Sequence, residues 1–92
     1  MIIRILGEGQ FDLPGEALDD INRLDDAVAA AVSAGDEDGF AAALATLLEA
    51  VRAEATPHFA ESLDESDVIL PMADATLSEV ADMLSDEGLI PG

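Results

Sequence analysis

The chain has a single histidine, His58, and two serines, Ser62 and Ser66, follow it within a short polar segment. An imidazole close to a hydroxyl could act as the general base of a serine nucleophile. That reaction also needs an oxyanion-hole turn, and no nucleophile-elbow pattern surrounds either serine. For a transition metal, a lone imidazole lacks a second nitrogen ligand, and the chain contains no cysteine. The pattern therefore favours a solvated or helix-capping histidine and predicts no catalytic residue.

Three other segments carry glycines or carboxylates that could serve a ligand. Gly7-Glu8-Gly9 has too few glycines for a phosphate-binding loop and precedes a strand pattern instead of a helix, so it is better explained as a hairpin turn. The carboxylate clusters Asp36–Gly39 and Asp64–Asp67 lack the ligand spacing of an EF-hand loop. We expect weak, non-specific association with cations at these clusters and predict no dedicated metal or cofactor site.

The net charge narrows the possible partners. Twenty-one Asp and Glu residues against three Arg and no Lys give a charge of −18 over 92 residues. A nucleic-acid-binding protein needs basic residues to displace counterions, and an anionic membrane repels an acidic surface. No segment approaches the roughly 20 apolar residues of a membrane-spanning helix, and no signal-peptide pattern opens the chain. We therefore expect one cytoplasmic domain, residues 1–92, that neither binds nucleic acid nor inserts into a membrane.

The kind of acidic surface indicates a salty environment. Asp outnumbers Glu, Lys is absent, and Ala supplies more than a third of the apolar residues. Asp is short and strongly hydrated, whereas Lys carries a long apolar stem. Such a surface keeps a protein soluble where high salt strengthens hydrophobic association. We expect a halophilic source; a GC-rich mesophile is the alternative, which the small number of Arg residues disfavours.

The first residues have the pattern of a β-hairpin. Residues 2–6 are mostly β-branched and apolar, and residues 10–13 alternate between polar and apolar. The glycines of Gly7-Glu8-Gly9 can adopt the positive φ angles of a tight turn. The pattern therefore predicts a hairpin over Ile2–Leu13.

Two helices are predicted next. Apolar residues three or four apart indicate one helix from about Leu18 to a C-cap at Gly35, and another from an N-cap at Asp36 to about Ala55. Because the connection is short, they should form an antiparallel helical hairpin. We expect alanines to lie between the helices and allow their axes to approach closely: Ala27, Ala31, Ala41 and Ala45.

The rest of the chain adds a strand and a helix. Thr56-Pro57 should stop the second helix and begin a polar loop over residues 57–66, and Asp67–Pro71 should add a third strand to the sheet. Thr76 and Glu79 have capping-box spacing before a short amphipathic helix to about Leu84. The order β-β-α-α-β-α predicts a small α+β domain, in which a short antiparallel sheet packs on the helical hairpin and the short C-terminal helix.

Apolar residues at the two ends of the chain are the most informative candidates for binding. Ile2, Ile3, Ile5 and Leu6 would place apolar side chains on both faces of the first strand, and one layer of helices covers only one face. A dimer or another protein could cover the second face. Leu89-Ile90 lies where chains are usually polar, and it either folds back onto the domain or docks on a partner.

Several segments resemble the PspA-associated proteins of the PspAA type, a family of actinobacteria and archaea that includes halophilic members. The similar stretches, which extend over nearly the whole chain, are Met1–Phe11, Val68–Pro71, Asp74–Leu77 and Asp86–Gly92. This sequence departs from the bacterial pattern at Met72, where a second proline or a small residue is expected.

The resemblance implies a non-enzymatic accessory or adaptor protein of the phage-shock-type envelope stress response. Its partner would be a PspA-type coiled-coil protein, which assembles on stressed membranes. We expect the first hairpin and the C-terminal tail to bind this partner or a second copy of the chain, through Ile3, Ile5, Gly7, Gly9, Gln10, Phe11, Leu89 and Ile90. The alternatives are a homo-oligomeric structural domain, such as an obligate homodimer, and a cation-binding module or small enzyme that uses His58 and the carboxylate clusters.

Overall fold

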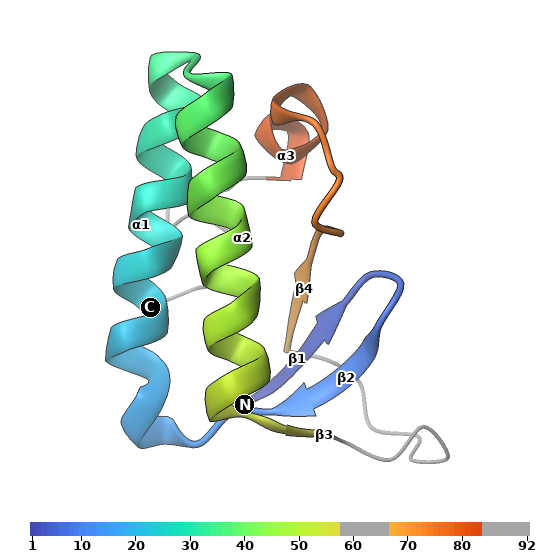
Figure 1. The fold of residues 1–92 in the computed structure, drawn as a ribbon. Coiled ribbons are helices and arrows are strands. Elements are labelled where there is room, and N and C mark those ends of the chain that lie inside the picture. Colours follow the sequence, from blue (N-terminus) through green and yellow to red (C-terminus); the bar gives the residue numbers. More distant parts are fainter. Residues whose placement is uncertain (58–66, 84–92) are drawn as a thin grey trace.

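The computed structural model describes residues 1–57 and 67–83 and has the predicted α+β architecture. Within these ranges, three α-helices and one 3-10 helix pack on one face of a four-stranded sheet (Figure 1). The strands are β1 (Ile2–Ile5), β2 (Gly9–Asp12), β3 (Thr56–Pro57) and β4 (Val68–Leu70). The helices are η1 (Gly15–Ala17), α1 (Leu18–Ala34), α2 (Glu37–Glu54) and α3 (Leu77–Met83).

The helical hairpin is formed by the two caps that the sequence predicts. Gly35 ends α1 with a φ of 67°, and its N–H donates to the carbonyls of Ala31 and Val32. Only glycine adopts this left-handed conformation without a steric penalty. Asp36 then begins α2, and its Oδ1 accepts a 3.0 Å hydrogen bond from the backbone N–H of Gly39. Because only these two residues connect α1 and α2, the helices run antiparallel side by side (Figure 1).

The sheet has the strand order β3-β2-β1-β4, and it is mixed instead of antiparallel. β1 and β2 form the predicted antiparallel hairpin, whereas β4 runs parallel to β1 and so corrects the predicted pairing. A short apolar run such as Val68–Leu70 has the same pattern in either direction, so the pattern could not specify its orientation. Thr56 and Pro57 are expected to stop the second helix, and Pro57 to begin a polar loop. They instead pair with β2 as an edge strand, where a proline is tolerated.

The core lies between the sheet and the helices. Alternate residues of β1 and β4 point into it, and large aliphatic side chains of α1 and α2 meet them from the other side. Its fully buried members, each with an exposed fraction of 0%, are Ile3, Ile5, Ile21, Val28, Leu44, Leu47, Leu48, Val51, Leu70 and Val80. At about 25 cal/mol per Å² of apolar surface, this layer is the main source of stability in the domain.

The predicted alanine contact between α1 and α2 is wrong. Ala27, Ala41 and Ala45 are exposed, and only Ala31 of the four packs against the core. The stripes that face inward consist of larger side chains, including Val28 and Leu44. Because a large aliphatic side chain removes more apolar area from water than alanine does, these stripes determine how each helix is rotated about its axis.

α3 begins at the predicted cap. The hydroxyl of Thr76 accepts a 3.2 Å hydrogen bond from the backbone N–H of Glu79, and it donates a 3.1 Å hydrogen bond to Oε1 of the same residue. Val80 anchors the helix in the core, where α3 lies against α1 and α2. The predicted continuation of this helix to Leu84, the tail Leu89-Ile90 and most of the predicted polar loop lie outside the described residues.

Candidate interaction surface

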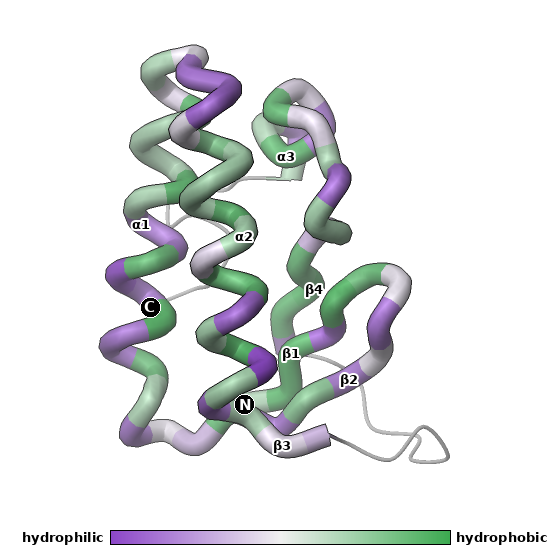
Figure 2. Tube along the Cα trace, viewed as in Figure 1, coloured by the Kyte–Doolittle hydropathy of each residue, from purple (hydrophilic) through white to green (hydrophobic). Residues whose placement is uncertain are grey.

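The face of the sheet that points away from the helices carries exposed apolar side chains. Leu6 directly after β1 is 39% exposed, Ile69 in β4 is 48% exposed and Met72 after β4 is 45% exposed. In Figure 2, hydrophobic colouring predominates along β1 and β4, whereas hydrophilic positions recur along α1 and at its connection to α2. We call Arg4, Leu6, Ile69 and Met72 together the open face.

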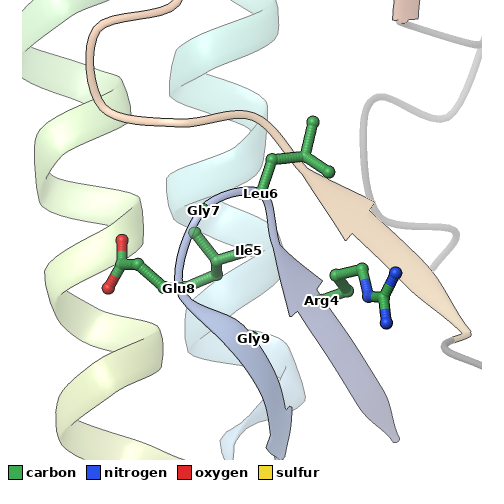
Figure 3. A pocket seen from close by; sticks show the side chains of 6 residues that line it. All are labelled: Arg4, Ile5, Leu6, Gly7, Glu8 and Gly9. Carbon is green, nitrogen blue, oxygen red and sulfur yellow. The ribbon is translucent and has the colours of Figure 1, made fainter.

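Arg4 lies at the centre of the open face. β1 is an inner strand, and Arg4 is opposite Gln10 of β2 on one side and Ile69 of β4 on the other. Its side chain and that of Leu6 point away from the helices, whereas Glu8 points toward α2 (Figure 3). The open face therefore combines one guanidinium group with an apolar neighbour on β4 and a polar neighbour on β2.

The three arginines differ in their partners within the described residues. Arg23 forms an ion pair with Asp20 on the surface of α1, and Arg52 forms one with Glu8. Arg4 forms no ion pair with any residue in the part of the chain that the structure describes, although the chain has 21 acidic residues. Among the residues that the structure describes, acidic groups thus pair with Arg23 and Arg52 and not with Arg4.

The turn between β1 and β2 connects the open face to the helical layer. Gly7 and Gly9 have φ angles of 86° and 111°, as predicted for a tight turn. A Cβ atom on Gly7 would lie 3.2 Å from Sδ of Met72, so this methionine lies directly against the turn. Residues 4–9 line a shallow depression of about 210 Å³ at this end of the sheet (Figure 3).

Glu8 fixes this turn to the end of α2. The Nε of Arg52 donates a 2.6 Å hydrogen bond to Oε1 of Glu8, and a second guanidinium nitrogen donates to Oε2. This hydrogen bonding is the largest influence on Glu8, and it lowers the pKa of its carboxyl below the ordinary 4.5 although partial desolvation acts in the opposite direction. The same pair raises the pKa of Arg52. Both groups therefore stay charged near neutral pH.

The residues predicted to bind a partner are distributed over several environments. Ile3 and Ile5 are fully buried and contribute to the core instead of the surface. Phe11 faces the same side as Ile3 and packs partly against the core, because the two residues are opposite each other in the ladder. Gly7 and Gly9 lie exposed at the turn, and Gln10 is half-buried beside Arg4. Leu89 and Ile90 lie outside the described residues.

The sequence analysis did not include Arg4, Ile69 and Met72 among the candidate binding residues. Knowledge of the strand register would have placed Arg4 and Ile69 on the exposed face of the sheet. Once the buried positions of β1 are assigned to Ile3 and Ile5, the alternation of a strand places Arg4 on the opposite face. The pairing of β1 with β4 then brings Ile69 next to it. The missing information was the partner and direction of β4, which the local pattern does not contain.

The carboxylates behave mainly as surface and capping groups. Within residues 1–57 and 67–83, no group of three or more histidine, cysteine or acidic side chains is arranged to hold a metal ion. Asp36 acts as the cap of α2, whereas His58 and most of the second predicted cluster lie outside the described residues. Asp25 is an exception, since it is 1% exposed on the inner side of α1 and has an interaction partner.

No helix in the described part is long and apolar enough to cross a membrane.

The described residues form a small two-layer α+β domain in which the helices pack on one face of the sheet. The chain belongs to the PspA-associated protein family, because the family model described as PspA-Associated protein matches residues 1–92, the whole chain. No curated protein and no solved structure matches the chain.

Proposed function

We propose that this protein is a non-enzymatic accessory protein that binds a PspA-type coiled-coil protein in the cytoplasm. The observation that carries the proposal is the family match over the entire chain. The exposed apolar side chains of the open face support it, because a soluble domain gains free energy when a partner covers such a surface. In this role the protein contributes to an envelope stress response by modifying the assembly of its partner.

We further propose that the outer side of the first hairpin and the tail residues Leu89 and Ile90 make the contact. On the hairpin, the exposed turn from Gly7 to Gly9 and the side chain of Arg4 beside Gln10 contact the partner. Ile3 and Ile5 are buried and stabilise the strand from the core.

The direct test is binding of the purified chain to the purified PspA-type protein of the same organism. Isothermal titration calorimetry in about 0.15 M and about 2 M KCl should give saturable heat, with apolar contacts preserved when salt screens long-range attraction. A double substitution, Leu89→Ser with Ile90→Ser, should weaken binding at least severalfold while the circular dichroism spectrum stays unchanged. Absence of binding at both salt concentrations would refute the proposed partner, and full binding by the folded double variant would refute only the role of the tail.

A homo-oligomeric structural domain is the second candidate, because a second copy could also cover the open face. Multi-angle light scattering at several protein and salt concentrations distinguishes the two functions. A stable dimer that does not bind the PspA-type protein would favour the structural role. A cation-binding module would instead give stoichiometric, saturable heat when divalent ions are titrated into the chain in high salt.

A further inference from the structure

We propose that the open face binds an amphipathic helix of the partner whose apolar stripe includes one carboxylate, and that this carboxylate pairs with Arg4. The proposal rests on the proposed function, and it specifies the chemistry and the surface of that contact. The occupant is a helix of the PspA-type protein, which lies across β1 and β4 with apolar side chains over Ile69 and Met72.

Charge complementarity is the first argument. Arg4 is the arginine without an ion-pair partner among the described residues, and its neighbours across the ladder are the apolar Ile69 on one side and Gln10 on the other. A guanidinium group beside apolar side chains favours a carboxylate with an apolar flank, since burial of the adjacent surface strengthens the charge-assisted hydrogen bonds. The chain carries a net charge of −18, so its acidic surface repels a carboxylate of the partner at most other places. The partner carboxylate is therefore directed to Arg4.

The geometry of the sheet is the second argument, and it favours a helix over an added strand. The edge strand β4 comprises three residues, and Pro71 directly follows it. An edge this short offers few backbone groups for pairing with an incoming strand. The exposed apolar residues instead follow β1, lie in β4 and follow β4, so they form a surface on the face of the sheet and not along its edge. A helix can pack on such a face as α1 and α2 pack on the opposite one (Figure 1).

A second copy of the chain is a weaker fit to this surface. Two copies that meet through the open face would bring two guanidinium groups together, and the four residues of this face include no carboxylate to pair with them. The charge of −18 on each chain adds a repulsion that high salt screens. Met72 adds adaptability, because an unbranched thioether side chain can follow the contour of a partner helix. It is 45% exposed and lies against Gly7, which places it at the border of the open face.

The test compares two charge reversals in the full-length chain. Arg4→Glu removes the proposed anchor, and Arg23→Glu makes the same change on α1, where the native arginine is exposed and pairs with Asp20. We expect Arg4→Glu to weaken binding to the PspA-type protein by roughly ten- to a hundredfold, as for the loss of a desolvated ion pair, and Arg23→Glu to change it less than about threefold. A second matched pair, Met72→Gln and Met83→Gln, tests the apolar contact, since Met83 is 37% exposed on α3 outside the open face.

Each outcome decides a different point. If the native chain binds and Arg4→Glu binds equally well, the inference is wrong and the proposed function stands. If Arg4→Glu and Arg23→Glu weakened binding equally, long-range attraction between the two proteins would explain the effect. That result would also overturn the proposed local contact at Arg4. Self-association that disappears in Arg4→Glu during analytical ultracentrifugation would assign the open face to a second copy. If the native chain does not bind at all, the proposed function fails and the inference fails with it.

Discussion

Glu8 and Arg52 connect the turn of the hairpin to the last turn of α2, residues 44 positions apart in the sequence. Their side chains remain 33% and 37% exposed, so water and salt screen the pair. Its contribution to stability is therefore that of a surface ion pair, about 0.2–1 kcal/mol. The ion pair matters for the open face because it holds the turn after β1 in place, and Gly7 of this turn lies against Met72.

We expect Glu8→Gln to lower the free energy of unfolding by about 0.5 kcal/mol near pH 7 in low salt. Because the pair lowers the pKa of Glu8 in the folded protein below 4.5, this stabilisation is complete above that pH and is lost as the pH falls through the lowered value. Urea denaturation of both proteins between about pH 7 and about pH 2 measures the difference. Glu16→Gln, which removes a charge without removing an ion pair, is the control. If the unfolding free energies of the native chain and Glu8→Gln differed by the same amount at every pH, the ion pair would not be the cause of the difference.

At the scale of single elements, local signals predicted most boundaries. Gly35 and Asp36 define the connection between α1 and α2, and Thr76 defines the start of α3, because each supplies a specific backbone conformation or hydrogen bond. The pairing partners of the strands could not be predicted in the same way. The direction of β4 and the pairing of Thr56-Pro57 depend on where the helical hairpin returns the chain, which no local pattern encodes.

The candidate surface could be predicted only in part for the same reason. The apolar residues of β1 indicated that side chains of this strand lie on both faces of the sheet, and Leu6 directly after it is indeed exposed whereas Ile3 and Ile5 are buried. They did not reveal which of these residues would face the helices. Ile3 and Ile5 became core residues once the register was known, and Arg4 with Ile69 became surface neighbours.

We expect Asp36→Ala to lower the free energy of unfolding by about 1 kcal/mol, because the backbone N–H of Gly39 loses its acceptor at the start of α2. Asp36→Asn preserves an oxygen acceptor and should restore most of the loss. Urea denaturation followed by circular dichroism at 222 nm measures both variants. A loss of similar size in Asp36→Asn would show that charge, and not the capping hydrogen bond, stabilises the helix.

At the scale of the whole molecule, the charge of −18 affects stability and association more than it affects the fold. In the described part of the chain, the acidic residues lie mainly on the helical surface and at helix starts, and self-repulsion among them opposes the compact state. Salt shortens the range of this repulsion from about 10 Å at 0.1 M to about 3 Å at 1 M. We propose on this basis that the protein functions in a salt-rich cytoplasm.

We therefore expect the thermal midpoint to rise by at least about 5 °C between 0.1 M and 2 M KCl. Differential scanning calorimetry measures the shift, and sucrose of matched osmolality serves as a control for effects other than ionic screening. A midpoint that stays constant or falls with KCl would contradict the proposed adaptation to salt.

The central claim is that a PspA-type partner covers the open face of the sheet. Methyl NMR of the full-length chain, labelled at Ile, Leu and Met and titrated with the purified PspA-type protein, tests this claim most directly. We expect the methyl signals of Leu6, Ile69 and Met72 to shift or broaden first, while that of Met83 on α3 changes little. Binding that changes Met83 or methyl groups of α1 and leaves Ile69 and Met72 unaffected would contradict the account.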